Sequence, residues 1–115
     1  KSIEIVYGLR NFIGNANKFS NKNVYINLKS DSEITEIIIE DDGSGFSRDI
    51  LSKIGEPYLK SNNPIEKSKV GLGLGLFIGK TLLEKNFALI NCRNSLTRGG
   101  AEIIIKWKNS DLFNI

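Results

Sequence analysis

Three short polar motifs, separated along the chain, have the residue types that a nucleotide site needs. Asn11, Asn15 and Lys18 recur at helical spacing, an acidic glycine turn runs from Asp41 to Gly45, and a glycine-rich segment runs from Gly71 to Leu76. Amide oxygens suit Mg²⁺, and a lysine can hold a phosphate as a point charge. A carboxylate at a strand end can accept a hydrogen bond from the exocyclic amine of adenine, and glycines let backbone N–H groups approach phosphates. The three motifs, in this order, predict one nucleotide site.

The glycine-rich segment does not fit the more familiar phosphate loops. A dinucleotide fingerprint that starts at Gly73 and Gly75 needs a third glycine where Ile78 stands, and a Walker A loop needs one where Leu74 stands. A membrane helix-packing face is excluded because the apolar stretch is too short. The remaining interpretation is a helix N-terminus that binds polyphosphate. For this segment alone, a tight helix–sheet contact without a ligand stays open.

The other two motifs also have plainer interpretations when each is taken alone. Aspartate and glycine favour ordinary turns, so the segment from Asp41 to Gly45 needs no ligand to explain it. Three polar residues on one helix face are commonly just solvated. The combination and its order, rather than any one motif, favour a nucleotide site.

Composition limits the function further. The chain has 115 residues, which fits one domain, and its formal net charge of +3 is too diffuse to indicate a nucleic-acid partner. There is no histidine, which excludes a histidine base, a histidine metal ligand and a phospho-acceptor histidine within this chain. The single Cys92 excludes a disulfide framework and fits a reducing compartment. The longest apolar stretch is about half of what a bilayer requires.

The periodicity of apolar residues predicts the elements that must position the motifs. Two long helices, one short helix capped by Ser47 and four strands are expected, followed by a loose tail. The helices are residues 3–19, 48–54 and 72–85, the strands are 24–29, 34–40, 89–94 and 101–108, and the tail is 109–115. Residues 57–69 form a polar loop, long enough to suggest a function. We expect an α+β fold, a two-layer α/β sandwich with helices on one face of a mixed or antiparallel sheet.

Several side chains are expected in the core of this sandwich. On the first strand, Val24, Ile26 and Leu28 alternate with polar residues, as in a half-buried strand. In the last long helix, the expected buried positions are Leu76, Ile78, Leu82 and Leu83. Cys92 lies in the middle of a strand and is expected to be an apolar filler rather than a redox sensor.

At this point the residues resemble the ATP-binding catalytic domain of sensor histidine kinases, a member of the GHKL superfamily with gyrase, Hsp90 and MutL. Five segments carry the resemblance: Asn11–Phe19 is similar to the N box, Asp41–Gly45 to the first glycine box, Pro57-Tyr58 with Lys60 to the aromatic box, Gly71–Leu76 to the G-x-G-L-G-L box, and Gly99-Gly100-Ala101 to a last glycine box. The last box departs from the pattern, since Ala101 stands where threonine is common. Tyr7–Asn11 together with Trp107 looks most like the RegB/PrrB subgroup of redox-responsive kinases.

The resemblance implies a Bergerat-type catalytic domain over residues 1–108, with an ATP lid at about 57–70 and a tail at 109–115. It implies ATP and Mg²⁺ as ligands, with Asn15 on the metal. It assigns catalytic roles to Asn11, Lys18 and Lys60. The implied ATP-binding residues are Asn11, Asn15, Lys18, Asp41, Gly43, Gly45, Tyr58, Gly71, Leu72, Gly73, Leu74, Gly75 and Leu76.

Asn11 discriminates among the activities of the superfamily. ATP-hydrolysing members typically have glutamate at the matching position, whereas an amide cannot accept a proton from water at neutral pH. The residue therefore favours phosphoryl transfer to a docked acceptor. Two alternatives stay open: a serine kinase like the anti-sigma factors of this superfamily, and a degenerate nucleotide-binding docking module.

The resemblance also implies binding partners and a subcellular location. The partners are a separate dimerisation domain that bears the acceptor histidine, a cognate response regulator and a second copy in a homodimer, with no nucleic acid. The chain begins almost at once with a helix, which suggests a domain taken from a longer protein. The implied place is the cytoplasmic side of an inner-membrane sensor, and this piece alone is expected to bind ATP without phosphorylating itself.

Overall fold

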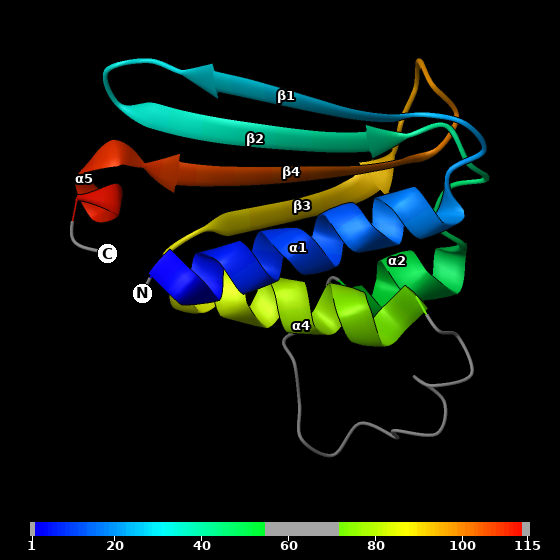
Figure 1. The fold of residues 1–115 in the computed structure, drawn as a ribbon, viewed down its shortest axis with the longest axis horizontal. Coiled ribbons are helices and arrows are strands. Elements are labelled where there is room, and N and C mark those ends of the chain that lie inside the picture. The colour runs from blue at the N-terminus through cyan, green and yellow to red at the C-terminus, as the bar shows by residue number, and fades with distance from the viewer. Residues whose placement is uncertain (1, 55–71, 114–115) are drawn as a thin grey trace.

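The structure, a computed structural model, describes residues 2–54 and 72–113. Its elements lie close to the predicted ranges (Figure 1). The helices are α1 (Ser2–Phe19), α2 (Arg48–Ile54), α4 (Leu72–Lys85) and α5 (Asn109–Leu112), and the strands are β1 (Val24–Ser30), β2 (Ile34–Asp41), β3 (Leu89–Asn94) and β4 (Ala101–Lys108). The predicted cap of α2 is confirmed, because the N–H of Ile50 donates to Ser47 Oγ at 3.2 Å.

The four described strands form one sheet in the order β1-β2-β4-β3. Every neighbouring pair is antiparallel, so the described sheet is antiparallel rather than mixed. In the central register, Ile39 of β2 lies opposite Ile26 of β1 and Ile103 of β4. Because side chains alternate along each strand, this register places Ile37 and Ile39 of β2 on the same face of the sheet as Ile103 and Ile105 of β4.

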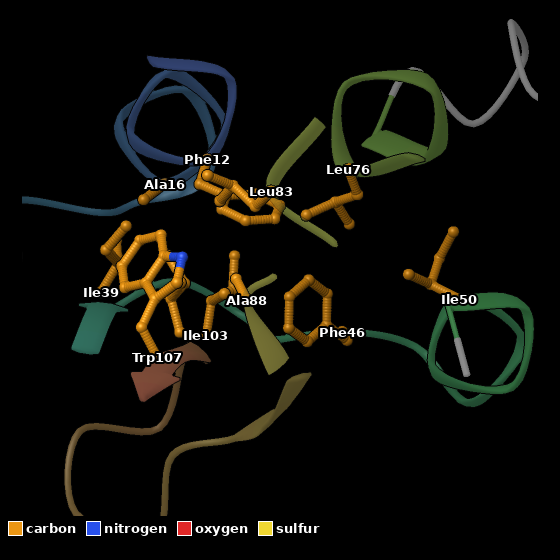
Figure 2. Close-up of a cluster of buried hydrophobic side chains, with 11 residues drawn as sticks. Phe12, Ala16, Ile39, Phe46, Ile50, Leu76, Leu83, Ala88, Ile103 and Trp107 are labelled. Carbon is orange, nitrogen blue, oxygen red and sulfur yellow. The ribbon is translucent and has the colours of Figure 1, made fainter. Parts of the chain in front are cut away.

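Helices α1, α2 and α4 cover that face, which gives the expected two-layer α+β sandwich (Figure 1). The core fills the space between the layers, and Figure 2 shows side chains from both layers pointing into it. Phe12 from α1, Leu83 from α4 and Ile105 from β4 are fully buried. Trp107 closes one end of this core, where its indole N–H donates to the carbonyl of Asn86 at 3.1 Å.

Three expected core positions are exposed instead. Ile26 and Leu28 lie on the helix side of the sheet, as the alternation predicts, but they are 54% and 69% exposed. β1 is an edge strand, and α1 packs more closely against β2 than against β1. Ile78 of α4 is 41% exposed because its face of the helix points away from α1 and the sheet, whereas the neighbouring Phe77 is buried.

Two glycines explain how α1 and α4 approach each other. A Cβ atom at Gly8 would lie 2.7 Å from Leu83 Cγ, and one at Gly79 would lie 2.8 Å from Phe12 Cε1. Glycine in a helix interior costs about 1 kcal/mol relative to alanine. Here that cost is offset by close contact between the helices, so the Gly79-Lys80-Thr81 segment serves packing rather than a phosphate loop.

We expect opposite effects of alanine at two helical glycines. Gly14→Ala should raise the free energy of unfolding by about 1 kcal/mol, because it gains helix propensity and meets nothing within 4 Å. Gly79→Ala should lower it, since overpacking typically costs about 1–3 kcal/mol and exceeds that gain. Urea unfolding of both variants measures the two changes. A shift of the same sign in both would contradict the packing role of Gly79.

The start of the expected tail is ordered. Asn109 to Leu112 form the short helix α5, so the prediction of a loose tail is wrong for these residues. Asn109 Nδ2 donates to the carbonyl of Asp31 at 2.8 Å, and Thr35 Oγ1 donates to Asn109 Oδ1 at 2.6 Å. These hydrogen bonds tie the end of β4 to the β1–β2 turn, a contact between segments far apart in sequence.

Candidate functional site

A pocket lies where the C-terminal ends of α1 and β2 meet the first half of α4. It brings together residues from the N box, the first and last glycine boxes and the G-x-G-L-G-L box. Its walls include Asn15, Asp41, Gly45, Phe46, Leu76 and Ala101. The motifs predicted to share one site therefore do share a pocket, although not every predicted residue lines it.

Asp41, at the end of β2, is held in this pocket by backbone groups. The residue is 3% exposed, and its Oδ1 accepts hydrogen bonds from the N–H groups of Gly43 at 2.8 Å and Ala101 at 3.2 Å. Within the part of the chain that the structure describes, no hydrogen bond reaches Oδ2. The carboxylate is thus fixed by one oxygen and can accept a ligand donor with the other.

The glycines beside Asp41 permit its surroundings. A Cβ atom at Gly43 would collide with the carbonyl oxygen of Phe19, and one at Gly100 would collide with the backbone and Oδ1 of Asp41. Gly45 has φ of +84°, a left-handed conformation that favours glycine. The first and last glycine boxes therefore meet around a single carboxylate, and Gly100 belongs to the site although it was not among the predicted ATP-binding residues.

Of the polar stripe on α1, only Asn15 lines the pocket. Asn15 is half-buried on the pocket wall, and a Cβ at Gly75 would lie 3.3 Å from its Oδ1. Asn11 does not line this pocket, and its Nδ2 donates to the carbonyl of Tyr7 at 2.9 Å, so its oxygen is the amide atom left for a ligand. Lys18 is exposed, with its Nζ 5.4 Å from the centre of the Phe19 ring.

Of the remaining residues predicted to bind ATP, the structure describes only some. Leu72, Gly73 and Leu74 form the first turn of α4, as expected, while Leu76 is buried and lines the pocket. Tyr58, Lys60, Gly71 and the predicted lid at 57–70 lie outside the described residues.

Asp42 has a structural role that its position in a variable slot did not predict. Its carboxylate accepts hydrogen bonds from the backbone N–H groups of Asn21, Lys22 and Asn23, at 2.9 to 3.3 Å. The bond from Lys22 contributes most to lowering the pKa of this carboxyl below its usual value. Asp42 therefore fastens the glycine turn to the loop between α1 and β1.

Asn94, at the end of β3, was also missed by the motifs. Its Oδ1 accepts from the N–H of Phe46 at 2.6 Å, and its Nδ2 donates to the carbonyl of Phe46 at 3.1 Å. An Asn-Ser pair before a glycine turn is a weak sequence signal, and nothing in it indicates a partner 48 residues away.

Most of the chain matches a known protein family. Residues 1–111 match the family described as histidine kinase-, DNA gyrase B- and HSP90-like ATPase. The chain belongs to this ATPase family. The family match and the relatives below confirm the resemblance stated from the motifs, and the domain is of the histidine-kinase type.

Two sensor proteins show the level of sequence identity between this domain and its relatives. The sensor histidine kinase RegB of Cereibacter sphaeroides is 37% identical over 97 residues, which take in 80% of this chain and 21% of RegB. The sensor protein KdpD of Clostridium acetobutylicum is 34% identical over 91 residues, 77% of this chain and 10% of KdpD. The chain thus spans about a fifth or less of the length of these relatives.

A solved structure confirms the fold of the domain. The catalytic domain of the histidine kinase ThkA aligns with a TM-score of 0.69 at 19% identity, over 94% of this chain and 69% of that one. Of the helices described, none is both long and apolar enough to cross a membrane.

Cys92 of this histidine-kinase-type domain is expected to be chemically inert in the folded state. Burial raises the pKa of its thiol from 9.0 to about 12, which lowers the thiolate fraction at neutral pH about a thousandfold. Maleimide labelling at pH 7.5 should therefore be far slower in native buffer than in denaturant. Equal rates in the two conditions would show an accessible, reactive thiol and would reopen a redox role.

Proposed function

We propose that this domain binds ATP with Mg²⁺ and presents the γ-phosphoryl group to a histidine on a separate dimerisation domain. One observation carries the proposal. Asp41 is the single carboxylate among the described residues that line the pocket, and backbone hydrogen bonds hold it where the base would bind. The helix beside the pocket carries the amides Asn11 and Asn15. Such groups can position a nucleotide, but neither amide can take a proton from water. This chemistry favours transfer to a docked acceptor over hydrolysis.

The donor groups of the pocket suit Mg²⁺ that is bound mainly by phosphate. Among the described residues, no cluster of three or more carboxylate, imidazole or thiolate groups is found, so an all-protein cage is not available there. Mg²⁺ commonly uses one or two protein oxygens and completes its shell with water and phosphate oxygens. Asn15 would supply the protein oxygen, and the ion would neutralise phosphate charge. Asn11 and Lys18 lie one turn away on either side of Asn15 and would contact the phosphates, with Lys60 from the lid.

Asn15→Ala is expected to remove the dependence of ATP binding on Mg²⁺. The methyl group of alanine cannot ligate the ion, while Asp41 and the glycine turn that hold the base are left unchanged. Calorimetric titration with a non-hydrolysable ATP analogue, with and without Mg²⁺, measures the effect. Asn17→Ala, an exposed amide on the same helix, is the control. Retained Mg²⁺ dependence in Asn15→Ala would place the metal on another residue.

The phosphoryl transfer itself is tested by adding a histidine-bearing dimerisation domain in trans. We expect adenine-selective, Mg²⁺-dependent binding by this chain alone, no self-phosphorylation, and acid-labile phosphohistidine on the added domain. Acid-stable phosphoserine on a partner would favour a serine kinase instead. Binding without any transfer would favour a docking module. In the full-length protein, we propose a cytoplasmic position for this domain, a homodimer, and a response regulator as the final acceptor.

A further inference from the structure

The turn that forms one wall of the nucleotide pocket has no regular secondary structure. It runs from Asp42 to Ser47, between the end of β2 and the start of α2. Gly45 and Phe46, within this turn, line the pocket. Backbone N–H and C=O groups next to a core require partners, and here no helix or sheet ladder supplies them.

Asn94 supplies the partners for Phe46. The two hydrogen bonds between its side-chain amide and the Phe46 backbone, at 2.6 and 3.1 Å, use both ends of the amide. The side chain of Asn94 thus pairs with the Phe46 backbone as the backbone of a neighbouring strand would, and it links the end of β3 to the turn. Because Phe46 is 6% exposed, loss of this amide would leave a buried N–H and a buried C=O unpaired.

The contact with Asn94 also restricts the residue before Phe46. A Cβ atom at Gly45 would lie only 2.6 Å from Asn94 Oδ1, and the left-handed φ of Gly45 already favours glycine. Gly45, the last position of the first glycine box, therefore gives room to Asn94 as well as to a ligand. On the other side of the turn, the carboxylate of Asp42 holds the α1–β1 loop, so the turn is fastened at both ends.

We infer that Asn94 is a positioning residue for base recognition: it holds the Gly45–Phe46 wall where an adenine ring that lies against this wall can donate its exocyclic amine to Asp41 Oδ2. This inference rests on the proposed nucleotide function of the pocket. Asn94 makes no contact with phosphate in this scheme, and it acts on the base end of the ligand alone. Its loss should weaken the binding of every adenine-containing ligand by a similar factor.

The test compares two asparagine variants that each remove a hydrogen-bonded amide. Asn94→Ala should raise the dissociation constants of both ATP and adenosine about tenfold, the effect of about one to two lost hydrogen bonds, and leave that of GTP nearly unchanged. Asn94→Asp, which keeps the acceptor for the Phe46 N–H but not the donor, should fall between Asn94→Ala and the wild type. The control is Asn86→Ala. The amide of Asn86 also forms side-chain hydrogen bonds, but its partners are Leu82 and Glu4 at the other end of α4.

Each outcome of these calorimetric titrations bears on a different claim. Reduced adenine-over-guanine preference in Asn94→Ala, with preference retained in Asn86→Ala, supports the inference. Unchanged preference in Asn94→Ala, or an equal loss in both variants at matched folded fraction, overturns it and leaves the proposed function intact. A wild-type protein without adenine preference overturns the proposed function, and the inference with it. Hydrogen exchange at the Phe46 amide should be faster in Asn94→Ala. This measurement reports on the hydrogen bond between Phe46 and Asn94 independently of any ligand.

Discussion

Asp41→Asn is expected to weaken adenine-nucleotide binding about 10- to 100-fold, the effect of losing a hydrogen bond to a charged group. The N–H groups of Gly43 and Ala101 would hold the amide oxygen where Oδ1 now lies. The amide nitrogen would then replace Oδ2 and point a donor at the exocyclic amine of adenine, which is itself a donor. Guanine presents a carbonyl oxygen at that place, so its binding should not weaken to the same degree. Calorimetry with ATP and GTP measures both changes.

Asp49→Asn is the matched control for this substitution. Asp49 is exposed in the first turn of α2 and lies outside the pocket, so the same loss of charge should leave both nucleotide affinities unchanged. If Asp41→Asn retains the wild-type affinity for ATP, the adenine ring does not contact this carboxylate, and the assignment of the pocket to the base is wrong.

Gly100→Ala is expected to damage both folding and binding. Its new methyl group would collide with the carbonyl group and Oδ1 of Asp41, which are fixed by strand pairing and by two hydrogen bonds. Because backbone atoms cannot move aside as a flexible side chain can, we expect a loss of about 1–3 kcal/mol in the free energy of unfolding. Displacement of Asp41 should also raise the dissociation constant of ATP by at least about tenfold. Urea unfolding and calorimetry measure the two effects separately.

The adjacent glycine provides the control for Gly100→Ala. Gly99 has φ of +83°, and nothing lies within 4 Å of the position that its Cβ would take. Asparagine tolerates this left-handed conformation better than most residues, so Gly99→Asn should change stability and ATP affinity little. Comparable losses in the two variants would mean that the loop conformation, rather than contact with Asp41, accounts for the effect of Gly100→Ala.

The sequence alone determined the three longer described helices, the four described strands and the order of the nucleotide motifs, but not the short helix α5. These features depend on interactions between residues close in the chain. The cap of α2 needs only Ser47 and Ile50, and the span of α4 follows from apolar spacing that ends near Lys85. The motifs were also sufficient to identify the family, because the spacing of Asn11, Asn15, Asp41 and the glycine-rich segment is itself the signal.

The burial of individual side chains could be predicted only in part, because it depends on which element covers which. Ile26 and Leu28 lie on the correct side of the sheet, but they are exposed since β1 is at its edge. Ile78 has the apolar character of a core residue but points away from α1 and the sheet. Periodicity predicts which residues share a face of a helix or strand. How far that face is buried depends on the elements that pack against it, which come from elsewhere in the chain.

Only the tertiary structure revealed how the base end of the pocket is held. Asp41 meets Ala101 and Gly100 across about half of the chain, and Asn94 reaches Phe46 over 48 residues. Asp42, which fills a variable slot of its motif, fixes a loop that precedes it by about 20 residues. An aspartate, an asparagine or a glycine in a turn satisfies local rules equally well with or without such a contact. Its distant partner is chosen by the strand order and register, which bring the ends of β2, β3 and β4 to one place.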